Sequence, residues 1–125
     1  YSKLLSEKLV SVSTPTTLIG FSIGASAIWK ISGSFNVDFI ENAICFYGSQ
    51  IRNHTKINPC IHMDLIFPVS EPGFSVGELG NILSKKKGVE IHTTPYRHGF
   101  MNSLSKNFSP VGYSEYIHWL CEHAR

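Results

Sequence analysis

The feature that most constrains the fold is the stretch TTLIGFSIGASAIWKI at residues 16–31. An apolar run typical of a strand ends at residue 21, and apolar side chains recur at helical spacing from residue 23 onward. Between them, the pentad GFSIG at residues 20–24 matches the pattern Gly-x-Ser-x-Gly. A turn this sharp between a strand and a helix would strain the backbone of Ser22 and expose its hydroxyl beyond the end of a sheet.

The neighbours of Ser22 suit the same turn. Gly20 and Gly24 flank it, and we expect a side chain at either position to collide with the neighbouring backbone. The N–H of Ile23, at the start of the expected helix, would point to the place where an oxyanion forms. The alternative is a glycine-rich turn with a surface serine of no chemical role, and the pentad alone does not separate the two.

Bulk composition excludes several classes of protein. The sequence has 125 residues, enough for one domain or part of one, with 42% hydrophobic and 16% charged residues. A net charge of +2 does not suggest a nucleic-acid partner. No apolar run approaches the ~18 residues that span a bilayer, so we expect no membrane partner. Three widely spaced cysteines favour a reducing compartment, and we expect a cytoplasmic protein.

Strand and helix patterns alternate along the chain. Apolar spacing and end signals predict helices at 2–11, 23–31, 75–87 and 113–123, and strands at 16–21, 41–48, 60–64 and 89–93. This order predicts an α/β fold of three layers, with a parallel sheet of about four strands flanked by helices. We expect a single domain over residues 1–125, whose first residues already read as a helix.

Three polar residues are expected where strands of this sheet end. Ser22 follows the first strand, Asp64 ends the third, and His98 follows the fourth. Functional groups of a parallel sheet gather at the carboxyl ends of its strands. A serine becomes a nucleophile when an imidazole takes its proton and a carboxylate orients that imidazole. The alternatives are a turn role for Asp64 and no role for His98.

Two other patterns, a second Gly-x-Ser-x-Gly pentad and a His-x-Asp pair, do not indicate a catalytic serine or a metal site. A second pentad, GFSVG at residues 73–77, has no strand before it, and Ser75 with Glu78 forms the capping box of the helix that follows. His62 and Asp64 have the types of side chain that bind metals, but two ligands on a strand end do not make a site. We therefore expect neither a metal nor a cofactor.

Four segments carry a resemblance to a known family. The segments GFSIGASAIWK, AICFYGS, DLIFP and PYRHGFMN, in this order and spacing, resemble the carboxyl-terminal half of the dienelactone hydrolase family of α/β-hydrolases. The resemblance covers nearly the whole chain. It implies Ser22 as nucleophile, Asp64 as acid and His98 as base. Dienelactone hydrolase itself has a cysteine where this chain has Ser22, so ester chemistry is expected in place of the named reaction.

We therefore expect a serine hydrolase that cleaves small carboxylic esters or lactones through an acyl-enzyme. The Ile23 N–H would supply one oxyanion donor, and Phe21, Phe67 and Phe100 would form the pocket wall. The alternatives are a non-catalytic module that keeps the turn for structural reasons and a peptidase of the same fold.

The resemblance also implies amino-terminal strands that should precede residue 1, and their absence would affect activity and assembly. They would carry the second oxyanion donor, so we expect the 125 residues alone to be inactive. Strand 16–21 would then lie at the edge of the sheet. There it would either pair with another copy of the chain in a homo-oligomer or leave an apolar patch exposed.

Overall fold

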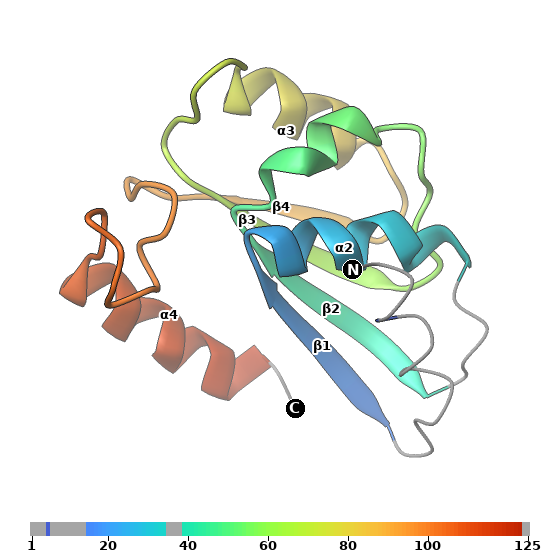
Figure 1. The fold of residues 1–125 in the computed structure, drawn as a ribbon. Coiled ribbons are helices and arrows are strands. Elements are labelled where there is room, and N and C mark those ends of the chain that lie inside the picture. The colour runs from blue at the N-terminus through green and yellow to red at the C-terminus, as the bar shows by residue number, and fades with distance from the viewer. Residues whose placement is uncertain (1–4, 6–14, 35–38, 124–125) are drawn as a thin grey trace.

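The computed structural model describes residue 5, residues 15–34 and residues 39–123. Apart from residue 5, the helix expected over 2–11 lies outside the described residues. With the labels of Figure 1, the elements are β1 (Thr16–Phe21), α2 (Ile23–Ile31), η1 (Ser32–Ser34), β2 (Ile40–Phe46), η2 (Ser49–Asn53), β3 (His62–Phe67), α3 (Val76–Ser84), β4 (Val89–Thr93) and α4 (Pro110–His123).

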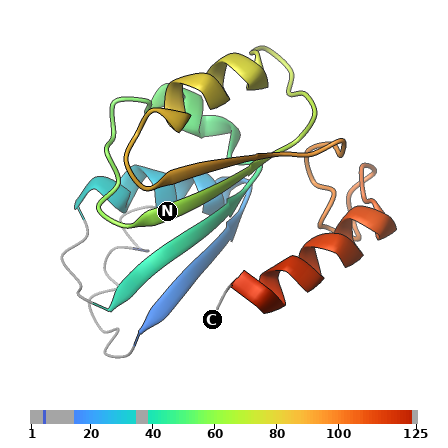
Figure 2. The same cartoon turned by 180° about the vertical axis from the view of Figure 1, so that it is seen from behind.

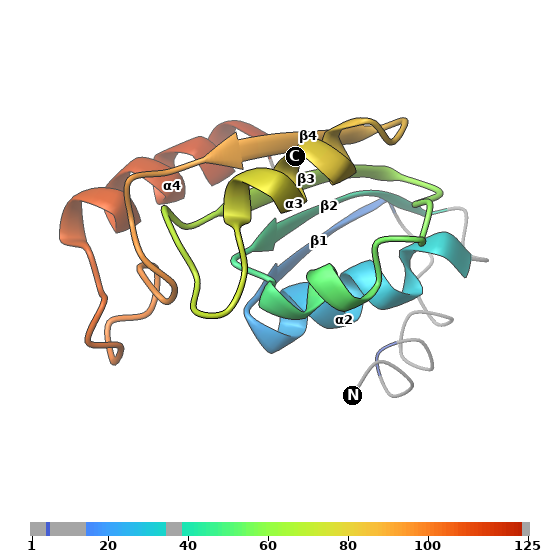
Figure 3. The same ribbon diagram turned by 90° about the horizontal axis from the view of Figure 1, so that it is seen from above.

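The four strands form one parallel sheet in the order β1-β2-β3-β4. Figure 3 shows the layers from above, with α2 and α3 on one face of the sheet and α4 on the other. The predicted α/β class, with a parallel sheet of four strands between helices, is confirmed.

Each face of the sheet has its own hydrophobic core. Under α2 and α3, the core is built around the fully buried Trp29, Met63 and Leu65. On the α4 face, buried residues of the inner strands β2 and β3 pack against Phe100 and Tyr116. Alternate side chains of one strand therefore enter different cores, which explains why β2 and β3 read as nearly continuous apolar runs.

The cap of α3 matches the sequence prediction. Ser75 has an extended backbone, and its Oγ accepts a hydrogen bond from the Glu78 N–H at 3.2 Å. The second Gly-x-Ser-x-Gly pentad is thus a helix start, as predicted. The helix ends at Ser84, three residues before the predicted end, and the chain turns into β4 through Gly88 at φ 79°.

Other predicted boundaries were also wrong, those of α4 and β3 among them. Helix α4 begins at Pro110 and not at 113, because Ser109 Oγ accepts a hydrogen bond from the Gly112 N–H at 3.0 Å and proline suits the first helical position. Strand β3 does not end at Asp64 but continues to Phe67. Its last three residues are all buried, so the strand continues until Pro68 ends the run.

Strand β1 is one of the two edge strands of the sheet and pairs with β2 alone among the described residues. Ile19 and Phe21 on this strand are each 41% exposed. The expected pairing of this edge with another chain stays a prediction. None of the helices in the described part of the chain has the length and apolar character needed to cross a membrane.

We predict that Gly20→Ala destabilises the protein by about 1–3 kcal/mol, the usual cost of overpacking. A Cβ at Gly20 would lie 2.7 Å from Ile28 Cδ1 and 2.8 Å from the backbone nitrogen of Ala25. Helix α2 would have to move off the sheet to make room.

The matched control is Gly77→Ala on α3, where the nearest atom to an added Cβ is Ser75 Oγ at 3.9 Å. Without a clash, this change should stabilise the helix by about 0.5–1 kcal/mol. Urea unfolding of the two variants measures both effects. Equal free energies of unfolding would contradict close contact between α2 and β1 at Gly20.

Candidate functional site

The turn after β1 holds Ser22 in an unusual backbone conformation. Its φ is 54° and its ψ is −115°, a region that L-residues rarely adopt. The strand ladder continues into this turn, because the Ser22 N–H donates to the Phe46 carbonyl at 2.9 Å. Helix α2 starts at once, with the Ser26 N–H donating to the Ser22 carbonyl at 3.0 Å. The serine is therefore fixed on both sides by backbone hydrogen bonds.

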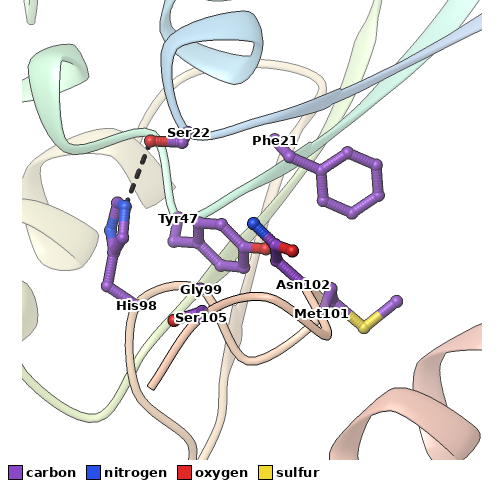
Figure 4. Close-up of a pocket in the computed structure, with 8 residues that line it drawn as sticks. All are labelled: Phe21, Ser22, Tyr47, His98, Gly99, Met101, Asn102 and Ser105. Carbon is purple, nitrogen blue, oxygen red and sulfur yellow. Dashed lines mark hydrogen bonds between the residues drawn. The ribbon is translucent and has the colours of Figure 1, made fainter. Parts of the chain in front are cut away.

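His98 meets Ser22 from the loop after β4. The distance between His98 Nε2 and Ser22 Oγ is 3.1 Å, shown as the dashed line in Figure 4. The carbonyl of His98 accepts a hydrogen bond from Asn107 Nδ2 at 3.0 Å, and Gly99 continues the turn at φ 89°. The two residues lie 76 positions apart in sequence, and the parallel sheet brings their loops together at one end.

The carboxylate that completes this arrangement is Glu71. Its Oε2 lies 2.8 Å from His98 Nδ1, and its side chain is only 5% exposed. The loop that carries Glu71 is anchored on both sides. Before it, the Val69 N–H donates to the Tyr96 carbonyl at 2.7 Å, and after it, the Arg52 guanidinium stacks on the Phe74 ring at 4.6 Å.

The assignment of Asp64 as the partner of His98 was wrong. Asp64 is the third residue of β3, and its Oδ1 lies 2.9 Å from His92 Nε2. Burial raises its pKa, but the hydrogen bond to His92 and the nearby His62 outweigh burial, so the pKa of Asp64 lies below its ordinary value. Because β3 runs three residues further than predicted, this carboxylate lies inside the sheet and not at its carboxyl end.

A signal for Glu71 was present in the sequence. It lies four residues beyond the true end of β3, in a loop that reaches the same edge of the sheet as Ser22. It is the one carboxylate between the end of β3 and the start of α3. The predicted end of β3 at residue 64 placed Asp64, and not Glu71, at the carboxyl end of the sheet.

A cavity of about 500 Å³ opens beside Ser22. Its walls are formed by Phe21, Ser22, Tyr47, His98, Gly99, Met101, Asn102 and Ser105 (Figure 4). Phe21 was correctly predicted as part of the wall. Phe67 and Phe100 were not, because they are 2% and 0% exposed and pack in the cores on opposite faces of the sheet.

Tyr47 is one of the wall residues that the sequence did not predict. It follows β2 with φ 41°, and its ring lies 4.7 Å from the His98 ring, centroid to centroid. Burial raises the pKa of its hydroxyl, while a hydrogen bond with the backbone of Met101 acts in the opposite direction. Positive φ at a residue other than glycine carries no clear sequence signature, but the strain it costs is characteristic of functional sites.

The arrangement has the parts that nucleophilic catalysis requires. Ile23 is the first residue of α2, so its N–H has no acceptor within the helix and lies beside Ser22. A base touches the serine, a buried carboxylate touches the base, and a cavity adjoins both. These contacts fit a hydroxyl that is activated for attack on a carbonyl carbon.

Comparison with known proteins adds little about chemistry. No protein-family model matches the chain. Over 94 residues it is 36% identical to a protein of Bacillus subtilis (strain 168) named "Uncharacterized protein YczH". The match covers 74% of this chain and 45% of that protein, so the chain spans less than half the length of the curated relative that it matches.

Proposed function

We propose that the protein is a serine hydrolase that cleaves small carboxylic esters or lactones through an acyl-enzyme. One observation carries this proposal: Glu71, His98 and Ser22 are connected by contacts of 2.8 and 3.1 Å at a strained strand–helix turn. The resemblance of the turn and of the His98 segment to the dienelactone hydrolase family supports the same reaction class. The acid differs from the sequence prediction, but the order serine, acid, histidine is kept.

Each residue has a distinct role in the proposed reaction. Ser22 Oγ attacks the carbonyl carbon while His98 Nε2 takes its proton. Glu71 accepts a hydrogen bond from His98 Nδ1–H, which selects the tautomer and stabilises the imidazolium. The Ile23 N–H donates to the oxyanion. His98 then protonates the leaving alcohol. In the second half of the reaction, His98 takes a proton from water as the water oxygen attacks the acyl carbonyl. His98 returns this proton to Ser22 Oγ as the acid is released.

The cavity supports a small substrate. Its volume of about 500 Å³ lies in the range of small-molecule sites, and its wall combines the aromatic Phe21 and Tyr47 with the polar Asn102 and Ser105. A peptidase would share the chemistry up to the acyl-enzyme and is the second candidate. A non-catalytic module is less favoured, because it would not need Ser22 and His98 within hydrogen-bond reach.

Cys45 and Cys60 are free thiols, and we place the protein in the cytoplasm on that ground.

The proposal predicts that, in the full-length protein, Ser22 is the residue that reacts with a fluorophosphonate probe. Ser22→Ala should abolish labelling, because the activated oxygen is removed. The matched control is Ser75→Ala, which should lose about 1 kcal/mol of stability through the missing helix cap and keep its labelling. Peptide mass mapping locates the label. Label on Ser75, or none on the folded protein, would contradict the proposal.

A second prediction concerns the carboxylate. Glu71→Gln keeps the shape of the side chain but cannot stabilise the imidazolium, so the labelling rate should fall by orders of magnitude, about 10⁴ for the equivalent change in a known triad. The rate of probe attachment is the readout, because it depends on activation of Ser22 and not on turnover.

The control for this variant is Glu78→Gln, the same substitution at an exposed position of α3, which should label at the normal rate. Circular dichroism verifies that both variants are folded. If Asp64→Asn shows the large loss and Glu71→Gln does not, the assignment of Glu71 is wrong.

A further inference from the structure

A cluster of histidine and carboxylate side chains that can bind metals lies on β3 and β4, outside the candidate active site. His62 and Asp64 are two positions apart on β3, so both side chains point to the same face of the sheet. Glu90 on β4 is the direct register partner of Asp64. This is the α4 face, which Figure 2 shows with α4 at the right and the amino ends of β3 and β4 at the left of the sheet. Ser22 lies at the opposite, carboxyl end of the strands.

The distances within this cluster suit a shared cation. His62 Nε2 lies 3.3 Å from Asp64 Oδ2 and 3.5 Å from Glu90 Oε2, and the three ligand atoms all lie within 4.8 Å of one another. Zinc bonds of about 2.0–2.2 Å at a tetrahedral angle separate two ligand atoms by about 3.3–3.6 Å. The two nitrogen–oxygen separations therefore leave room for a metal ion to bridge these atoms.

His92 supports the same arrangement from the neighbouring position. Its Nε2 lies 2.9 Å from Asp64 Oδ1, so the other carboxylate oxygen of Asp64 is directed to His62. The His92 ring makes an edge-to-face contact with the ring of Trp119 on α4, with the ring centroids 5.3 Å apart. This contact fixes the orientation of the His92 ring. Carboxylates that bind metals are commonly held by such a second hydrogen bond.

The charges of the cluster also favour a cation. Asp64 and Glu90 are carboxylates directly opposite each other on adjacent parallel strands, an arrangement that repels when both are ionised. A divalent cation would replace this repulsion by two attractions and connect the outer strand β4 to β3. One imidazole with two carboxylates suits Zn²⁺ or a similar transition metal better than Mg²⁺.

We propose that His62, Asp64 and Glu90 bind a divalent transition-metal cation, with His92 as the positioning residue of Asp64. Water would complete the coordination on the exposed side, where the Glu90 side chain is 65% exposed. This proposal replaces the sequence-based expectation of no metal. It is independent of the proposed hydrolase, because the cluster shares no residue with the Ser22 site.

Calorimetric titration of the whole 125-residue chain with Zn²⁺, after treatment with chelator, tests the proposal. We expect one ion per chain and a higher melting temperature when it is bound. Glu90→Gln and His62→Gln should each weaken binding at least ~10-fold, since each removes one of three ligands. Both side chains are well exposed, at 65% and 41%, so both variants should fold.

Two controls distinguish this cluster from other histidines and carboxylates. Glu41→Gln removes an exposed carboxylate on β2, and His118→Gln removes the exposed partner of Glu122 on α4, at 2.9 Å. Both variants should bind Zn²⁺ as the unchanged chain does. Absence of binding, normal binding by Glu90→Gln and His62→Gln, or loss in His118→Gln would each overturn the proposal.

Discussion

The hydrogen bond from the Ser22 N–H to the Phe46 carbonyl is the contact on which the candidate active site depends. It extends the β1–β2 ladder one residue past the strand, at a backbone conformation that would otherwise be unfavourable. The helix start at Ile23 then follows without a connecting loop. Such a turn is possible only where helix and strand are in close contact, and Gly20 is the residue that permits this contact.

The parallel topology determines what can surround that serine. The loops after β1, β2, β3 and β4 all leave the sheet at the carboxyl ends of the strands. They carry Ser22, Tyr47, Glu71 and His98 respectively. A sheet with antiparallel neighbours would send alternate loops to opposite ends. The side chains are therefore collected by topology, and hydrogen bonds set only their final orientation. This explains why residues 76 positions apart can lie 3.1 Å from each other.

Elements with a strong local cause could be predicted from the sequence. The turn at Ser22, the capping box of α3 and the run of β4 each follow from residues within a few positions of one another. The position of His98 followed from topology. The acid did not, because the predicted run ended at the charged Asp64 and residues 65–67 were assigned to the loop that follows, which made β3 look shorter than it is. Tyr47 could not be found, because its strained backbone is imposed by tertiary packing.

The error over Asp64 and the cluster at His62 have the same physical origin. In a strand, residues two apart share a face, so Asp64 lies on the same face as His62. From this position inside β3 it cannot reach the loops beyond Phe67. Register then brings Glu90 opposite Asp64, a contact between strands that no local pattern could indicate. The two ends of β3 thus face different chemistry: its amino-terminal half contributes to the histidine and carboxylate cluster, and its carboxyl end leads to the loop that carries Glu71. One carboxylate could not have served both ends.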